Sequence, residues 1–434
     1  MKHWFKDQHF RSLLKNTSYL GISRAVAAVC GIATIALAGR GLGLLLLGTL
    51  ILITSYAKAV SGIAKFQSWQ VIVRFGGQGV AQGDPEHFKI ATGFAFSLDL
   101  VSGIAGMLVA VALLPFIAGW VGIPPQYLWL GIFYCTLLPT MGSATPSGVM
   151  RVLDRFDLIG WSDTLTPISR AILITASYLS NAPFVAYLIV WYATDLAGDL
   201  FTWFLAWREL RRTGHLEGIR PTLRPTQLPG AWRFAIDVNL AASVQAIWGP
   251  TGRLVVGGLL GPAGAALFRV ASTLADSAQK PADLLGRAFY PEVMRMDFTT
   301  KRPWKLMLRV MAFASGIALF AISLLLIGGK PLVSLIFGHA FVQAYKPLVI
   351  LMIIPFLGVF SFPLSPMLYA LGRSDGPLKA KLIGSLAFFG TIAPLSWQFG
   401  VTGAAIALVI GNAANVAAML VQLRSEHRRV RARA

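Results

Sequence analysis

The sequence predicts an all-α integral membrane protein with about twelve transmembrane helices arranged as two six-helix bundles. Of its 434 residues, 56% are hydrophobic and only 13% are charged, whereas soluble domains carry about 25% charged residues. Apolar segments of about 20 residues, long enough to cross a bilayer as helices, recur along the whole chain. Lysine and arginine gather in every second connection between these segments, as they do in membrane proteins with short cytoplasmic loops.

Twelve segments meet the length and composition of a transmembrane helix. In chain order they cover residues 17–38, 44–73, 90–114, 127–150, 158–179, 184–207, 234–256, 263–290, 304–327, 344–370, 378–397 and 401–423. The tails and the connections after even-numbered spans, counted together with the first six residues of the spans that follow them, hold 27 cations, whereas the opposite side counted in the same way holds Arg40, Lys330 and Lys346. The positive-inside rule therefore predicts twelve spans with both termini in the cytoplasm.

The longest cytoplasmic connection divides the chain almost evenly. Its composition, rich in Arg, Pro and Gly, is typical of a linker. The predicted organisation is a cytoplasmic N-tail, an N-terminal bundle, the linker, a C-terminal bundle and a basic C-tail, at residues 1–16, 17–207, 208–233, 234–423 and 424–434.

Two pairs of short motifs recur at one common offset, close to half the chain length, and indicate an internal repeat. GRGLG at residues 39–43 matches GGLLG at 257–261, and VLDRFD at 152–157 matches ALGRSD at 370–375. Because each half has an even number of spans, the halves share one orientation, and a cavity between the bundles is the expected place for function.

Eight further cations fall inside predicted spans, where each lysine or arginine costs about 2.5 to 3.5 kcal/mol at the bilayer centre. They are Arg24, Lys58, Lys65, Arg170, Arg253, Arg269, Lys280 and Arg287. Lys58 and Lys65 are seven residues apart and share a helical face on the second span. In the eighth span Arg269, Asp276, Lys280, Asp283 and Arg287 form a second polar stripe.

By the common offset, Asp276 is the repeat equivalent of Lys58, and Asp283 is the repeat equivalent of Lys65. Two interpretations remain open and are compatible if they describe different states. In the first, these residues pair across the bundle interface and hold the halves together. In the second, the cations line a water-filled cavity for an anionic substrate. The substrate-binding candidates are Arg24, Lys58, Lys65, Arg253, Arg269, Lys280 and Arg287.

Acidic residues in or beside the spans are candidates for charge partners or for coupling to a proton or sodium gradient: Asp99, Asp237, Asp276 and Asp283. Asp99 suits either a proton carrier or a hydrogen-bonded buried acid. Asp163 and Arg170 are seven residues apart and are expected to pair. Asp195 and Asp199 are interpreted as lining a solvated cytoplasmic vestibule. Three prolines in the tenth span, at positions 355, 363 and 366, predict kinks there.

Several classes of function are excluded or disfavoured. No phosphate-binding loop is present, both cysteines lie in apolar segments, and all six histidines lie in tails or connections. No metal, bound cofactor or catalytic residue is therefore expected, and the chain is not expected to be an enzyme. The basic tail RSEHRRVRARA is interpreted as contacting anionic membrane lipids, not nucleic acid.

The chain resembles the Wzx-type polysaccharide flippases of the multidrug/oligosaccharidyl-lipid/polysaccharide (MOP) exporter superfamily. The resemblance rests on GRGLGLLLLGTLILITSYAKAVSGIAKFQSWQVIVRFG, GVMRVLDRFDLIGWSDTLTPISRAILI, LYALGRSDGPLKAKLIG and FGVTGAAIALVIGNA. It implies a V-shaped bacterial inner-membrane transporter with alternating access that moves undecaprenyl-pyrophosphate-linked oligosaccharides to the periplasmic leaflet. A polysaccharide polymerase and a chain-length regulator are the implied partners. A pyrophosphate fits the cationic spans because lysine and arginine bind phosphate strongly.

Other functions fit less well. A cation-coupled multidrug exporter of the same superfamily typically has an acidic residue in the first span, where this chain has Arg24 and no acid. The related peptidoglycan-precursor flippase has helices beyond twelve. A membrane glycosyltransferase or polymerase would need catalytic acids or large loops on the external side, and a non-transporting scaffold would leave the buried cations without a purpose.

Overall fold

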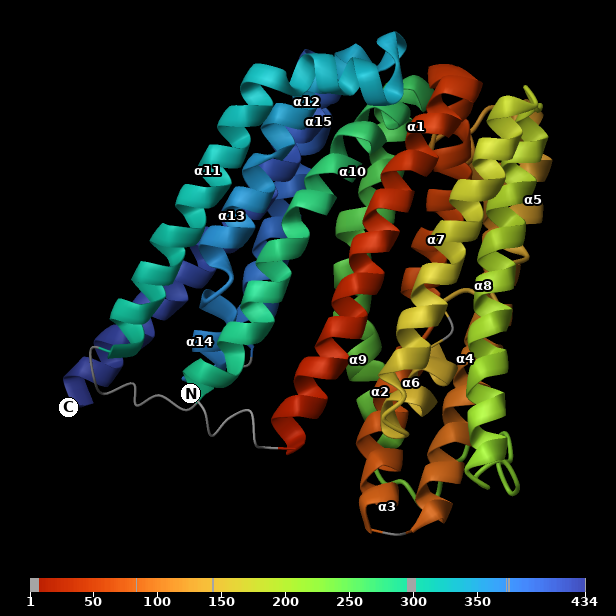
Figure 1. Ribbon diagram of the computed structural model, residues 1–434, viewed down its shortest axis with the longest axis vertical. Coiled ribbons are helices and arrows are strands. Elements are labelled where there is room, and N and C mark those ends of the chain that lie inside the picture. Colours follow the sequence, from red (N-terminus) through yellow and green to blue (C-terminus); the bar gives the residue numbers. More distant parts are fainter. Residues whose placement is uncertain are drawn as a thin grey trace. The chain divides into compact units, whose positions relative to one another are not determined.

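A computed structural model describes residues 8–82, 84–142, 144–294, 302–371, 373 and 375–433. Nearly all of these residues are helical and none of them forms a strand, which confirms the predicted all-α membrane fold (Figure 1). In chain order the main helices are α1 Gln8–Ala64, α2 Ser68–Val71, α3 Gly77–Gln82, α4 Pro85–Ile117, α5 Leu128–Cys135, α6 Ala144–Val152, α7 Phe156–Leu179, α8 Phe184–Arg212, α9 Ala231–Ala246, α10 Gly252–Met294, α11 Arg302–Phe337, α12 Tyr345–Leu351, α13 Ile353–Ser361, α14 Leu364–Ala370 and α15 Gly376–Arg433.

Six stretches of the described helices are long and apolar enough to cross a membrane. Three of these stretches contain a glycine at which the helical geometry is interrupted: Gly43 in α1, Gly261 in α10 and Gly400 in α15, with φ of 71°, 70° and 58°. Only glycine adopts this left-handed region readily, so the chain can turn sharply there (Figure 1). The two arms of α1 and of α15 correspond to two predicted spans each, and Gly261 separates the seventh span from the eighth.

The repeat found in the sequence is present in the backbone. Gly43 and Gly261 are equivalent in the repeat and have nearly the same φ and ψ, 71° and −178° against 70° and −177°. A hydrogen bond from Arg155 N to Met150 O of 2.8 Å recurs as Arg373 N to Leu368 O at 2.9 Å, again at the common offset. The two halves therefore share turn geometry as well as short motifs.

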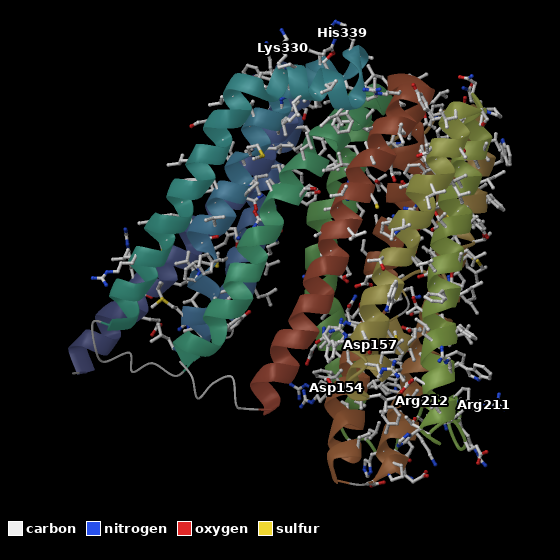
Figure 2. The ribbon with its side chains drawn as sticks, in the orientation of Figure 1. Asp154, Asp157, Arg211, Arg212, Lys330 and His339 are labelled. Carbon is white, nitrogen blue, oxygen red and sulfur yellow. The ribbon has the colours of Figure 1, made fainter. Side chains whose placement is uncertain are left out.

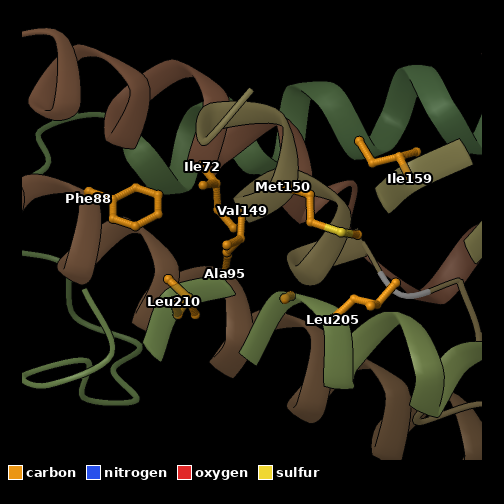
Figure 3. Packing of buried hydrophobic residues seen from close by; sticks show 9 residues of the cluster. Ile72, Phe88, Ala95, Val149, Met150, Ile159, Leu205 and Leu210 are labelled. Atoms are coloured by element: carbon orange, nitrogen blue, oxygen red, sulfur yellow. The ribbon is translucent and has the colours of Figure 1, made fainter. Parts of the chain in front are cut away.

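The chain divides into two compact units, Met1–Gly41 with Ile53–Thr251 and Leu42–Leu52 with Gly252–Ala434. In the first unit, nine buried residues from α4, α6, α7, α8 and the π-helical turn Ile72–Gly76 form one core, which Figure 3 shows around Val149 and Met150. The second unit has a core from α11, α14 and α15 that includes Met367 and Leu368, the repeat equivalents of that pair. Unit 1 also contains residues 234–251, which the sequence assigns to the C-terminal bundle, since Ala235, like Ala231 of the linker, packs against Phe94 of α4.

Each unit holds an arginine between two acids at the turn that follows its broken fourth span. Arg155 bonds Asp157 at 2.8 Å and Glu209, at the end of α8, at 2.7 Å. In unit 2, Arg373 lies 3.6 Å from Asp375 and 3.3 Å from Glu426, which is near the end of α15. We call these sets the Arg155 triad and the Arg373 triad. Arg212 also bonds Glu209, at 2.6 Å. Figure 2 shows Asp157 and Arg212 near one another.

Three predicted segments differ from the structure. The second span is broken at Lys65, where α1 ends, and the fourth span is broken between α5 and α6. The connection at residues 328–343, predicted to be an external loop, is instead largely helical, because α11 continues to Phe337 and a 3₁₀ helix follows. The linker packs on unit 1: a Cβ on Gly93 of α4 would lie 2.1 Å from Arg220 O. Residues 1–7 of the N-tail and the side chains of 427–434 in the C-tail lie outside the described part of the chain.

The two triads should differ in strength. We expect Arg155→Gln to destabilise the protein by about 2 kcal/mol, because it removes charged hydrogen bonds to Glu209, whose side chain is only 4% exposed. Arg373→Gln should cost less than about 1 kcal/mol, because its partners are farther away and more exposed. Thermal unfolding of the two variants in detergent measures this order, and an equal or reversed order would contradict it.

Acid should abolish the effect of Arg155→Gln. Burial opposes ionisation of Glu209, which lies beyond the predicted sixth span, but hydrogen bonds from Arg212 and Arg155 outweigh it and hold the pKa below the ordinary 4.5. A hydrogen bond from Arg155 likewise lowers the pKa of Asp157 below 3.8. Such stabilisation is complete above the ordinary pKa and lost as pH falls through the lowered one, so the wild-type advantage should hold above about pH 5 and shrink below about pH 4. An advantage that is independent of pH would be the contrary result.

Candidate functional site

Lys58 lies in the second arm of α1 and faces a carboxylate of its own unit. Its Nζ is 3.9 Å from Asp195 Oδ2 on α8, and the two side chains are 40% and 14% exposed. The repeat in the sequence predicts Asp276 as the partner of Lys58, and the sequence interpretation places Asp195 in a solvated vestibule. That interpretation of Asp195 is wrong, because its carboxylate is largely buried among polar side chains of α1, α5, α7 and α8.

Asp195 accepts hydrogen bonds from two further residues. Tyr134 Oη of α5 donates to Oδ2 at 2.5 Å, and the guanidinium of Arg170 on α7 donates to Oδ1. Arg170 also donates to Thr194 Oγ1 at 2.9 Å, and its guanidinium lies 5.2 Å from the ring centre of Trp191. We call Lys58, Tyr134, Arg170 and Asp195 the Asp195 cluster. Arg170 thus pairs with Asp195, and the pairing with Asp163 predicted from the spacing of seven residues is not the one that the structure shows.

Lys65 follows the last residue of α1 and lies at the break of the fourth span. Its Nζ donates to Pro139 O at 3.1 Å and to Met141 O at 2.5 Å, and the residue is only 6% exposed. Carbonyl groups at the end of a helix have no partner within it and carry partial negative charge, so an ammonium group stabilises them. The structure therefore gives Lys65 a local role at this break.

Asp99 of α4 stabilises the other side of the same break. Its carboxylate accepts from Thr145 N at 2.9 Å, at the start of α6, and from Ser68 Oγ at 2.6 Å. A carboxylate is favourable at a helix N-terminus, where backbone N–H groups are unsatisfied. Asp99 is 2% exposed and contributes to the electrostatic environment of Lys65. The sequence suits Asp99 either to carry a proton or to be a hydrogen-bonded buried acid. The contacts with Ser68 and Thr145 are those of a hydrogen-bonded buried acid.

The other candidates lie elsewhere. Arg24 is half-buried on the first arm of α1 and interacts electrostatically with Asp163 of α7. Asp237 is exposed on α9. In unit 2, Arg253 interacts electrostatically with Arg269 and with Asp276, an exposed residue of the same helix. The side chains of Lys280, Asp283 and Arg287 lie outside the described part of the chain, so their predicted roles stay predictions.

The sequence did not identify Tyr134 and Asp195 as partners of the buried cations, although one signal was available. The predicted spans that contain Lys58, Asp195 and Arg170 have their external ends at residues 44, 184 and 179. Each of the three charged residues is a similar number of residues away from the external end of its span. At 1.5 Å per residue their depths agree within about 8 Å. Matching charges by depth would therefore have grouped them. Within the described ranges, no three His, Cys, Asp or Glu side chains gather closely enough to hold a metal ion.

Comparison with solved structures defines the class of fold. An inward-facing multidrug resistance MATE family transporter of the MOP superfamily matches with a TM-score of 0.69 at 16% identity, over 94% of this chain and 95% of that one. The lipid II flippase MurJ in an inward closed conformation gives 0.68 at 12% identity, over 95% and 89%. A mutant of the Vibrio cholerae MATE transporter VcmN gives 0.64 at 16% identity, over 96% and 97%. The chain has the MOP transporter fold.

A sequence relative defines the family more narrowly. The inner membrane protein YghQ of Escherichia coli strain K12 is 40% identical over 347 residues, which are 80% of this chain and 98% of YghQ. The chain belongs to the family of YghQ and is a multi-pass inner-membrane protein. No family model matches the chain.

The Asp195 cluster predicts unequal costs for its two cations. Arg170→Met should lower stability by about 3 kcal/mol, because it removes the direct partner of a largely buried carboxylate. Lys58→Met should cost about 1 kcal/mol or less, since Lys58 is 40% exposed and 3.9 Å from Asp195. Thermal unfolding in detergent checks both, with Lys346→Met, at an exposed position of α12 in unit 2, as the control. A larger loss for Lys58→Met than for Arg170→Met would refute this assignment.

Proposed function

We propose that the protein is an alternating-access flippase that moves an undecaprenyl-pyrophosphate-linked oligosaccharide from the cytoplasmic to the periplasmic leaflet for surface polysaccharide assembly. The MOP fold and the inner-membrane family support a transporter of this general kind. The observation that carries the choice of an anionic substrate is the pair of arginines Arg253 and Arg269 inside unit 2.

These arginines lie eight residues before and eight residues after the turn at Gly261. At 1.5 Å per residue, each is about 12 Å along its helical arm from the turn. Arg269 repels Arg253, because the two charges are alike, while Asp276 attracts it. A pyrophosphate between them would remove this repulsion and accept several charge-assisted hydrogen bonds.

The first repeat shows that the fold does not require arginines at these positions. Gly43 corresponds to Gly261, and eight residues to either side of it lie Ile35 and Ile51. These isoleucines are 5% and 4% exposed and belong to the apolar core. Since packing is satisfied by apolar residues at the equivalent positions, Arg253 and Arg269 are better explained by a ligand than by folding.

The remaining cations contribute differently in this proposal. Lys58, which is 40% exposed, stays a predicted contact for the negative charge of the substrate, whereas Lys65 maintains the break of the fourth span. Arg24, Lys280 and Arg287 stay predicted substrate contacts. The 27 cations on the side of the tails and even-numbered connections support cytoplasmic termini. A polysaccharide polymerase and a chain-length regulator are the expected partners, and membrane lipids surround the spans.

A cation-coupled multidrug exporter is the alternative, because MATE transporters share the fold. Such a protein needs carboxylates that can exchange a cation. Two buried acids of unit 1 are already engaged, Asp195 with Arg170 and Asp99 with Ser68 and Thr145. This favours the anionic substrate. Coupling to a proton or sodium gradient stays a prediction. Among the described acids, Asp276 interacts electrostatically with Arg253.

The test is direct binding of a lipid diphosphate to the purified protein. Native mass spectrometry should detect undecaprenyl diphosphate on the wild type and little undecaprenol, which has the same tail without the charge. The double variant Arg253→Gln with Arg269→Gln should bind undecaprenyl diphosphate at least about tenfold more weakly, a change of about 1.4 kcal/mol.

Arg309→Gln provides the matched control, because Arg309 is an exposed arginine of α11 in the same unit. It should bind the diphosphate as the wild type does. Unchanged binding by the double variant, or equal binding of undecaprenol and its diphosphate, would show that Arg253 and Arg269 do not recognise a phosphate group.

A further inference from the structure

The break in the fourth span exposes backbone carbonyl groups inside unit 1. Helix α5 ends at Cys135 and α6 begins at Ala144, with turns over residues 136–142. Inside a membrane, backbone carbonyl groups that leave a helix need a partner within the protein, since unsatisfied ones cost several kcal/mol each. Two of these groups, Pro139 O and Met141 O, receive hydrogen bonds from Lys65.

The surroundings of the Lys65 ammonium have the composition of a monovalent cation site. Its Nζ lies 3.1 Å and 2.5 Å from the two carbonyl oxygens, and the residue is 6% exposed. Asp99 supplies a buried carboxylate, and both Asp99 and Asp199 attract the ammonium. Carbonyl oxygens from unwound helices, with a carboxylate nearby, are the groups with which membrane transporters bind sodium.

Asp99 is held in place independently of Lys65. Ser68 Oγ and Thr145 N donate to its two oxygens at 2.6 Å and 2.9 Å, and the Ser68 and Thr145 hydroxyls lie 3.3 Å apart. Removing the lysine side chain would therefore leave this carboxylate and the two carbonyl groups in place without the ammonium group that interacts with all three. An unpaired charge in such a place is strongly unfavourable.

We propose that Lys65 is a built-in cation that occupies a carbonyl-lined monovalent cation site at the break of the fourth span. The covalently attached ammonium makes unit 1 independent of sodium or potassium from solution at this position. Shortening the side chain vacates the site, which then takes a monovalent metal ion. This inference rests on the proposed function and deepens it, because it assigns any ion coupling of transport to residues other than Asp99.

Thermal unfolding of Lys65→Ala in detergent tests the proposal, with choline, sodium, potassium or lithium chloride at one fixed concentration as the only variable. Choline is too large for the site and keeps the ionic strength constant. The wild type sets the baseline, and its melting temperature should change much less among the four salts than that of Lys65→Ala. Lys65→Ala should melt several degrees lower in choline and regain at least half of the loss in one of the metal chlorides, saturably with its concentration.

Two further variants make the result specific. Lys58→Ala, which removes the other lysine of this arm, should show no dependence on the cation. Adding Asp99→Asn to Lys65→Ala should abolish the rescue, because the site then lacks its carboxylate.

Equal melting of Lys65→Ala in all four salts would overturn the proposal. So would a sodium effect of the same size in the wild type, or failure to recover folded Lys65→Ala from membranes solubilised in any of the salts. These melting temperatures are measured without substrate. Loss of the cation effect would leave lipid diphosphate binding at Arg253 and Arg269 intact, and absence of that binding would leave the cation effect of Lys65→Ala intact.

Discussion

An ionised side chain inside a bilayer has to find its counter-charge and hydrogen-bond partners within the protein. In unit 1 this constraint links six helices through a few side chains. Asp195 of α8 joins Tyr134 of α5, Arg170 of α7 and Lys58 of α1. Lys65, directly after α1, stabilises the end of the first half of the fourth span. Asp99 of α4 stabilises the start of the second half. The broken span is tolerated because both of its internal ends have charged partners.

The two halves of the repeat share one plan and differ in charge. They have in common the left-handed glycine turn, a backbone hydrogen bond and an arginine held between two acids, all at or within one position of the common offset. The charged residues inside the spans do not follow this symmetry. In the second half Arg253 is repelled by Arg269 and attracted by Asp276, whereas the first half has isoleucines at the positions of both arginines. Because the turns are the same in both halves, we attribute them to folding. Because the charges differ between the halves, we attribute the arginines of the second half to a ligand.

Much of the fold was predictable because hydrophobic length and positive-inside patterning are strong signals. The all-α class, the turns at Gly43 and Gly261 and the repeat all follow from the sequence. The charge partners did not, because a spacing rule such as that applied to Asp163 and Arg170 considers one helix at a time. Arg170 instead finds Asp195 on the neighbouring helix. The break at Lys65 was also missed, since its neighbours are apolar and the break depends on contacts with Pro139 and Met141, which are distant in the sequence.

The central claim is that the protein moves a lipid carrying a diphosphate between leaflets, and transport in proteoliposomes measures this most directly. Vesicles would contain a fluorescent oligosaccharide linked to undecaprenyl diphosphate, and an external glycosidase would report how fast the lipid changes leaflet. Vesicles with the protein should expose the internal pool faster than empty vesicles, and the Arg253→Gln, Arg269→Gln protein should behave like no protein. Equal rates with and without the protein, or equal acceleration for the same glycan on phosphate-free undecaprenol, would contradict the account.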